Sequence, residues 1–318
     1  MRRLHISIYR QPIESVRLDQ NIKSCMHTQE FTHGLTDFGI AGSRGQTLVL
    51  GGQWFSSHKT ERDFENLKSV VVREAGIGQA WERLDFDKFC HDFPNLEYID
   101  IEYEKVDNLD WLSKLQNLKH LGIRCKAIKE PLLKQTNLPL LESMDITGHE
   151  VLISLIGSEV QALKIWGYKA ENFEQFQCSN LRTLELIKAP KLASLNGLCE
   201  LLRLVELNIY SAPKLANFSS ALSSCSLEKL SFQSCKSLDA PETGEGESLT
   251  YLSFLDCGNL TTVNWIKRLK VLGKLRIGGT GVTDGKVDFL KFIHGISKLH
   301  IENKKHYDWK FSNPTYFN

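Results

Sequence analysis

Apolar residues recur along this chain in the pattern L-x-x-L-x-L, in which Ile, Val, Met or Phe can replace Leu. The clear copies begin at Leu96, Leu118, Leu141, Val160, Leu181, Leu204, Leu227, Leu249, Leu272 and Ile296. Successive starts are 22, 23, 19, 21, 23, 23, 22, 23 and 24 residues apart, and an earlier copy begins at Leu67. Spacing this regular indicates an internal repeat.

The L-x-L centre of each copy alternates with period two, which predicts a β-strand with one buried face. A unit of about 22 residues buries too little surface to be stable alone, so neighbouring units must stack. Stacking places the strands in one parallel sheet of ten or eleven strands. Each unit then has room for short 3₁₀ or one- to two-turn helical pieces on the convex side, and none for long helices.

Several copies extend to L-x-x-L-x-L-x-x-(A/C)-x-x-L, as in the unit that runs from Leu227 through Cys235 to Leu238. In this motif and in its short period, the chain resembles the leucine-rich repeat family, and the internalin-like bacterial subclass in particular, over residues 60–302. The resemblance implies an α/β solenoid curved like a horseshoe, with a parallel sheet on its concave face. It also implies a protein-binding activity.

The ninth position of each unit faces inward at the turn, where the family usually places Asn or Cys. Five units carry a residue small enough to fit, namely Ala189, Ala212, Cys235, Cys257 and Thr280. Four units carry a larger residue there, namely Glu104, Lys126, His149 and Tyr168. We therefore expect a differently built turn between about residues 100 and 170.

The repeat divides the chain into three parts. Residues 1–60 form an N-terminal cap, which consists either of degenerate repeats around Ile13 and Gly45 or of an unrelated segment. Residues 61–302 form the solenoid. Residues 303–318 are rich in aromatic side chains and form either a C-terminal cap over the last repeat or a partner-binding tail. A solenoid needs caps because its terminal units otherwise expose their core.

Composition limits the class of protein. Apolar residues make up 42% and charged residues 24% of the chain, which are the values of a globular protein. Lys and Arg total 39 and Asp and Glu 38, so the chain as a whole is not a basic nucleic-acid coat. No apolar run reaches 18 residues, so we expect no membrane span. Eight dispersed cysteines and the lack of a signal-peptide core favour reduced thiols and a cytoplasmic location.

The sequence contains no recognisable catalytic motif. It has no P-loop, no G-x-S-x-G and no H-E-x-x-H, and its G-x-G sequences lack the third glycine of a dinucleotide fingerprint. It has no C-x-x-C pair that would suggest a structural zinc site. We therefore expect no enzyme activity, no cofactor and no metal.

Binding residues are expected on the concave face, where positions 3, 5, 7 and 8 of each unit point to solvent. Aromatic side chains occupy several of these positions, namely Tyr98, Tyr103, Trp166, Tyr210 and Tyr251. Asp100, Glu102 and Asp145 are close to them in the repeat pattern. Exposed Tyr and Trp supply much contact area at small entropic cost, so these eight residues are the predicted partner-binding site. In the alternative interpretation, the aromatic side chains pack on neighbours within the sheet.

Charge is unevenly distributed along the repeat. Residues 92–110 have a net charge of −6, and residues 261–318 have a net charge of +7. The basic end contributes a second candidate patch, formed by Lys274, Arg276, Lys298 and His300. Asymmetry of this kind can steer a partner, although ordinary solvated faces also explain it.

These observations predict a monomeric, non-catalytic protein-binding module. In its most specific form, the hypothesis is a bacterial immunity protein that neutralises a basic toxin, such as a nuclease, through the acidic and aromatic concave face. A substrate-recognition or scaffold subunit is an equally good interpretation. Nucleic-acid binding at the basic C-terminal end is the alternative from a different class.

Overall fold

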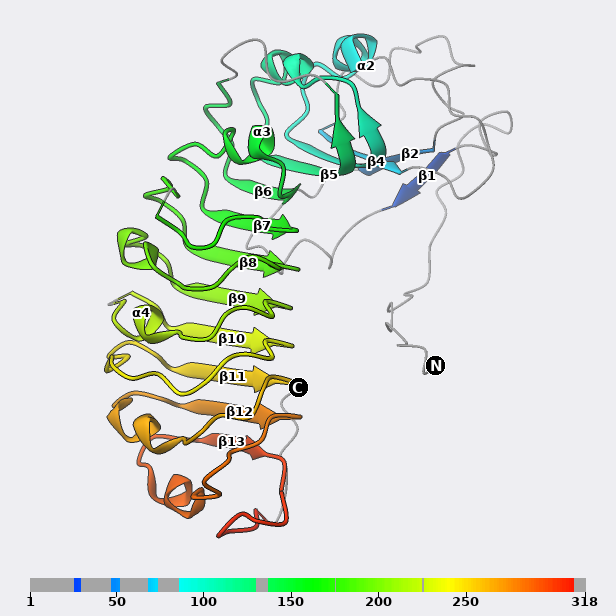
Figure 1. Ribbon diagram of the computed structural model, residues 1–318. Helices are drawn as coiled ribbons and strands as arrows, with labels where there is room; N and C mark the ends of the chain where they lie inside the picture. The colour runs from blue at the N-terminus through cyan, green and yellow to red at the C-terminus, as the bar shows by residue number, and fades with distance from the viewer. Residues whose placement is uncertain are drawn as a thin grey trace.

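In the computed structural model, the described residues are 26–29, 47–51, 68–73, 86–129, 137–174, 176–224 and 226–311. Their strands form one 13-stranded sheet in which every strand lies beside its neighbours in sequence, from β1 to β13 (Figure 1). β1 (Met26–Gln29) pairs antiparallel with β2 (Thr47–Gly51), and β2 pairs parallel with β3 (Ser69–Arg73). The strand order therefore follows the sequence order of the repeats.

The strands from β3 onward are parallel and in register, one for each repeat unit. After β3 they are β4 (Tyr98–Val106), β5 (His120–Ile128), β6 (Ser143–Thr147), β7 (Ala162–Trp166), β8 (Thr183–Ile187), β9 (Glu206–Tyr210), β10 (Lys229–Gln233), β11 (Tyr251–Leu255), β12 (Lys274–Gly278) and β13 (Lys298–Ile301). The eleven strands β3–β13 confirm the predicted leucine-rich repeat solenoid.

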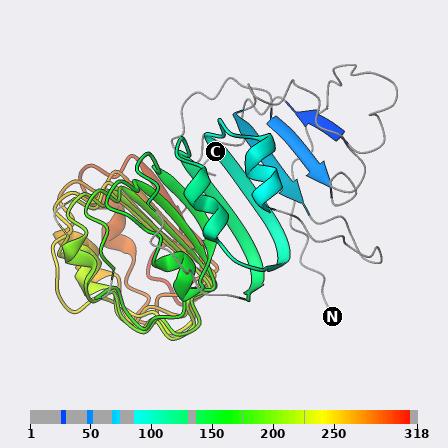
Figure 2. The same ribbon diagram turned by 90° about the horizontal axis from the view of Figure 1, so that it is seen from above.

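Within the described residues, the return segments of the coils carry only short helical pieces, as predicted. They are α2 (Phe86–Asp92), η3 (Asp110–Lys114), α3 (Glu150–Ile153), η4 (Leu198–Glu200), α4 (Ser219–Leu222), η5 (Asn264–Arg268) and η6 (Asp288–Phe292). Seen from above, the later coils overlie one another, with their strands along one side of the stack (Figure 2). The concave surface is therefore the face of the sheet that points away from the return segments.

The core consists of columns of apolar side chains that run through the stack. The residues at the fourth position of the unit are fully buried, including Ile99, Leu121, Leu184, Leu207, Leu230 and Leu252, each with 0% exposure. Parallel in-register pairing places each of them beside its counterpart on the next strand, for example Leu207 beside Leu230. The predicted buried column is confirmed, and with it the register of the repeat.

A column of left-handed residues ends the strands of the regular units. Gly167, Lys188, Ser211, Ser234, Asp256 and Gly279 have φ values of 76°, 59°, 60°, 56°, 50° and 61°. This geometry turns the backbone so that the N–H of Lys188 donates to the Tyr210 carbonyl of the next coil at 2.8 Å. The small ninth-position residues follow directly, and Ala189, Ala212, Cys235 and Thr280 are fully buried there.

Two of the four units with large ninth-position residues lack this turn, as predicted, whereas the Tyr168 unit keeps it, with a φ of 76° at Gly167. β4 and β5 each continue for nine residues, so Glu104 and Lys126 lie on extended strands, where they form an exposed ion pair at 3.2 Å. Tyr168 is 5% exposed, and its hydroxyl donates to the Asn172 carbonyl at 2.7 Å. An extended strand has no tight inward turn, so it accepts a side chain of any size at this position.

At both ends the described segments pack on the solenoid. β2 pairs Leu48 and Leu50 with Val70 and Val72 of β3, and the earlier copy predicted around Ile13 lies outside the described residues. At the other end, Tyr307 is buried, and its hydroxyl accepts the Val282 N–H at 2.9 Å. The division of the chain into two caps and a solenoid stays a prediction.

The six cysteines in the described ranges are free thiols, and five of them are buried. Among the described helices, none is both long enough and apolar enough to cross a bilayer.

Candidate partner-binding face

The strand register sorts the concave side chains into three rows across the sheet. The row at the third position begins with Tyr98 and His120, and the row at the fifth begins with Asp100, Gly122 and Asp145. The seventh-position row is made by Glu102, Arg124, Thr147, Trp166, Ile187 and Tyr210. The row membership of Arg124, Lys164 and Ile187 could be found from the repeat spacing, but we expected none of them at the site.

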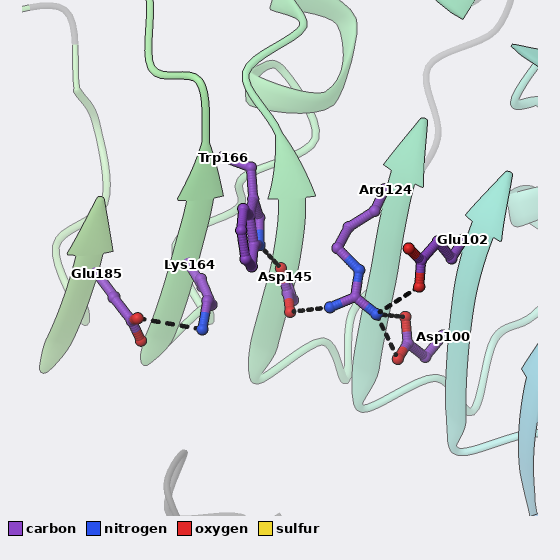
Figure 3. A network of polar contacts seen from close by, with 7 residues as sticks. All are labelled: Asp100, Glu102, Arg124, Asp145, Lys164, Trp166 and Glu185. Atoms are coloured by element: carbon purple, nitrogen blue, oxygen red, sulfur yellow. Dashed lines mark hydrogen bonds and ion pairs between the residues drawn. The ribbon is translucent and has the colours of Figure 1, made fainter. Parts of the chain in front are cut away.

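Arg124 lies at the centre of a charged network on β4, β5 and β6 (Figure 3). Its Nη1 donates to Asp145 Oδ2 at 3.2 Å, and its Nη2 lies 3.3 Å from Asp100 Oδ2. Glu102 Oε2 is 3.6 Å from the same Nη2. The three acids that the sequence suggested as a negative patch therefore share one guanidinium.

Asp145 passes this constraint to Trp166 on β7 (Figure 3). The indole Nε1–H donates to Asp145 Oδ1 at 2.7 Å, and Lys164 Nζ lies 5.2 Å from the centroid of the Trp166 ring. Lys164 in turn forms an ion pair with Glu185 of β8 at 3.1 Å. The indole N–H of Trp166 is bound to Asp145, and Lys164, which lies over the ring, is paired with Glu185. These contacts hold the Trp166 side chain in one orientation.

Burial distinguishes these acids from ordinary surface carboxylates. Asp100 is 7% exposed, and burial raises the pKa of Asp145 above its usual value. The charge of Arg124 and the hydrogen bond from Trp166 act in the opposite direction on that pKa. Gly122 makes room for the network, because a Cβ there would lie 2.6 Å from Asp100 Oδ1.

Tyr98 stacks on the neighbouring His120, with ring centroids 4.3 Å apart and an interplanar angle of 8°. His120 is 5% exposed, and its Nδ1 lies 2.7 Å from the Ser143 hydroxyl. Burial lowers the pKa of His120 to about 4, so the imidazole is neutral at pH 7. The pair is a flat, uncharged platform beside the Arg124 network, which fits both the predicted binding role and packing within the sheet.

Tyr103 does not join this face, contrary to our expectation that position 8 points to solvent. β4 remains extended through Tyr103, so side chains continue to alternate between the two sides of the sheet. Glu102 is exposed, whereas Tyr103 is partly buried and packs against the core. Position 8 leaves the core side only in units that turn after position 7.

The acidic character predicted for residues 92–110 is also largely cancelled by the next coil. Four ion pairs join residues one repeat of 22 apart: Glu97 with Lys119, Glu102 with Arg124, Glu104 with Lys126 and Asp107 with Lys129. Over residues 92–129 the sequence holds seven acids and six bases, so the net charge is −1. The sequence alone could have predicted this compensation, because the acids and bases that pair are 22 residues apart, which is one repeat.

The other two predicted aromatic residues lie further along the sheet. Tyr210 on β9 is separated from Trp166 by one strand, and Ile187 of β8 is in register with both of them. All three side chains are partly buried, and we call them the Trp166 row. Tyr251 lies on β11 in a different row, where its neighbours in register are Lys229 and Lys274.

The predicted basic patch lies on the last two strands. Lys274 pairs in register with Lys298, and Arg276 pairs with His300. Lys274 and Lys298 are exposed, and Arg276 and His300 are partly exposed. These four residues are therefore neighbours on β12 and β13.

The described residues offer little catalytic chemistry. No group of three or more His, Cys, Asp or Glu side chains in these ranges converges in a way that could hold a metal ion. Burial raises the pKa of the Cys178 thiol to about 11, which makes it a poor nucleophile at pH 7. A hydrogen bond from Cys235 lowers the pKa of Cys257, but Cys257 is only 5% exposed.

The sequence matches no protein-family model and no curated protein. Among solved structures, one similar chain is an internalin, inlF, from Listeria monocytogenes. It is 12% identical, with 84% of this chain and 86% of that chain covered and a TM-score of 0.46. The functional domain of InlJ from Listeria monocytogenes, which includes a cysteine ladder, is 15% identical, and the alignment covers 79% of this chain and 62% of that chain with a TM-score of 0.36. The fold class stated above rests on the strand register and buried columns of this chain.

Proposed function

We propose that this protein is a non-catalytic protein-binding module whose concave face, from β4 to β9, receives a partner protein. The Trp166 row carries the proposal. It places two aromatic side chains and an isoleucine on three adjacent strands, about 4.8 Å from one strand to the next. Partly exposed Trp and Tyr dominate the energetics of many interfaces, and an anchor held in place before binding loses little entropy.

The contacts of Trp166 indicate which chemistry the partner brings. Its only donor, the indole N–H, is already bound to Asp145. The ring can therefore contribute its apolar faces and its π-system, and no further hydrogen bond. We infer that the partner residue that lies on Trp166 is apolar or cationic.

The specific form of the proposal is neutralisation of a basic protein toxin in the cytoplasm by a monomeric immunity protein. Two exposed carboxylates at the edge of this face support a basic partner, since the side chains of Glu102 and Glu104 are 57% and 51% exposed. The ion pairs with the next coil weaken that electrostatic support, so the aromatic contacts carry most of the predicted affinity. A scaffold or substrate-recognition role would use the same surface.

A pull-down with two Trp variants tests the proposed face. Trp166→Ala removes the central anchor, and Trp309→Ala is the matched control because Trp309 is 43% exposed on a different part of the molecule. A protein captured by the parent and by Trp309→Ala should bind Trp166→Ala more weakly by about 2 kcal/mol, or roughly 30-fold. The proposal is wrong if Trp166→Ala binds like the parent, or if only Trp309→Ala loses the partner.

Co-expression tests the toxin hypothesis separately. The captured protein is produced in a bacterial host with and without the present chain. Growth arrest that the parent chain relieves, and that Trp166→Ala does not, is the expected result. A captured protein that is harmless to the host would contradict the immunity role and leave the scaffold role.

A further inference from the structure

The two ends of the solenoid differ in how their charges are compensated. In the N-terminal acidic segment, the next coil supplies the opposite charges, as described above. Residues 261–318 hold eleven Lys or Arg residues and four acids, a net charge of +7. The excess of positive charge therefore remains at the surface of the last coils.

Three of the four acids of this segment accept hydrogen bonds from backbone N–H groups. Asp308 Oδ1 accepts the N–H groups of Val287 and Asp288 at 2.8 and 3.0 Å, and Asp284 Oδ1 accepts the N–H of Lys286 at 3.0 Å. Glu302 accepts the Gly279 N–H at 2.9 Å and pairs with Lys304. Within the described residues, the pair of Glu302 with Lys304 is the only ion pair that these four acids form.

Lys274 and Arg276 are cations of the concave face that have no carboxylate partner among the described residues. Neither forms an ion pair within the described part of the chain, whereas the comparable Lys229 of β10 pairs with Glu206 at 3.0 Å. They project from alternate positions of β12, beside Lys298 and His300 of β13. We call Lys274, Arg276 and Lys298 the basic concave patch.

Ser253 on β11 adds a second, independent observation. It is 0% exposed, its hydroxyl has no hydrogen-bond partner among the described residues, and it pairs in register with Arg276. A buried hydroxyl without a hydrogen-bond partner lowers the stability of the protein, and a ligand that bonds to it would remove that penalty. A carboxylate bound at Arg276 would have this hydroxyl as a neighbouring donor.

The borders of the patch limit the kind of anion. Asp256 is exposed at the end of β11, and a Cβ on Gly279 would lie 2.1 Å from its Oδ1. Glu302 binds the N–H of the same Gly279. These two carboxylates close one end of the patch and would repel any polyanion that continues past it, so the patch fits a short run of negative charges.

We propose that the basic concave patch docks an acidic polypeptide segment, with a carboxylate held by Arg276 and flanking carboxylates held by Lys274 and Lys298. A guanidinium fits a carboxylate in a bidentate manner, and the lysines supply point charges on either side. This surface is separate from the Trp166 row, so the inference does not depend on the function proposed above.

Fluorescence anisotropy with a labelled hexaglutamate peptide tests the inference, and a labelled oligothymidylate of equal charge tests the nucleic-acid alternative. The double variant Lys274→Gln with Arg276→Gln removes two cations from the patch. Lys169→Gln with Lys214→Gln is the control, because these exposed lysines leave the strands of the concave face unchanged and alter the net charge equally. Trp166→Ala shows whether the peptide binds at the other site.

The patch variant should bind the peptide at least about tenfold more weakly than the parent, while the control and Trp166→Ala should stay within about twofold. Thermal melting should show that all variants fold, since the substituted lysines and Arg276 lie outside the core. If Arg276→Gln unfolds the chain, the double variant Lys274→Gln with Lys298→Gln takes its place. Equal peptide binding by patch variant and control would overturn the inference. So would tighter binding of the oligothymidylate, with affinity falling steeply between about 50 and 200 mM salt.

Discussion

Removal of the Arg124 guanidinium should destabilise the protein more than removal of an ordinary surface charge. Arg124→Met keeps most of the aliphatic side chain and leaves Asp100 and Asp145 without their shared cation. At 3.2–3.3 Å and an effective dielectric constant of about 20, each ion pair is worth about 5 kcal/mol before desolvation. Desolvation of these three largely buried groups offsets most of this, so we expect a net loss of about 3 kcal/mol at pH 7.

The loss should depend on pH with a definite sign. Burial already raises the folded-state pKa of Asp145 above its ordinary value of 3.8, and Arg124 opposes that rise. Without Arg124 the pKa of Asp145 rises further, so the ionised carboxylate is the species that destabilises the variant. The penalty is complete above the folded-state pKa of the variant, and this part of it disappears once the pH falls below about 3.8, where Asp145 is protonated in both states.

Urea unfolding followed by circular dichroism at pH 7 and about pH 4 measures both effects. Arg203→Met is the control, since Arg203 is exposed and makes one hydrogen bond, to Asn180; it should cost less than about 0.5 kcal/mol. Adding Asp145→Asn to Arg124→Met should recover part of the loss and keep an acceptor for the Trp166 indole. A loss below about 1 kcal/mol at pH 7, or one unchanged at the lower pH, would refute the reasoning.

Two further predictions concern the solenoid itself. Leu207→Ala should cost about 3 kcal/mol, because Leu207 is 0% exposed in the buried column, and a melting temperature within a degree or two of the parent would mean that the register is wrong. Ser211→Gly should stabilise the protein by up to about 1 kcal/mol, because Ser211 has a φ of 60°. The matched change Gln233→Gly lies in a regular strand and should destabilise by about the same amount; loss of stability in both variants would show that Ser211 is not strained.

The sequence predicted the periodic part of the structure well, for a physical reason. An apolar residue at the fourth position can be satisfied only by burial between its counterparts, so the spacing of residues such as Leu207 and Leu230 determines strand, register and stacking together. The size of the ninth residue determined where the turn changes, since Glu104 and Lys126 do not fit an inward turn. These properties depend on one repeat and its nearest neighbour, and a linear sequence carries that information.

The sequence predicted which face of the sheet carries most of the candidate residues, but it did not predict how their charges are compensated. Position alone placed Asp100, Asp145 and Trp166 on one face, but not Tyr103, whose orientation depends on how far β4 stays extended. Charge counted along the chain made residues 92–110 a negative surface. Ion pairing acts across coils, and Arg124 converts the same acids into a compensated and partly buried network.

The sequence by itself thus determined the solenoid, its register and the rows of side chains on its concave face. Only the tertiary structure decided which of those side chains keep their charge at the surface and which are held by a neighbour. Burial of a leucine depends on the local repeat, whereas the field around a carboxylate depends on every charge within a few ångströms, including those 22 residues away. For this reason Lys274 and Arg276 form no ion pair within the described part of the chain, while Asp100 and Asp145 share Arg124, and Asp145 also binds the indole of Trp166.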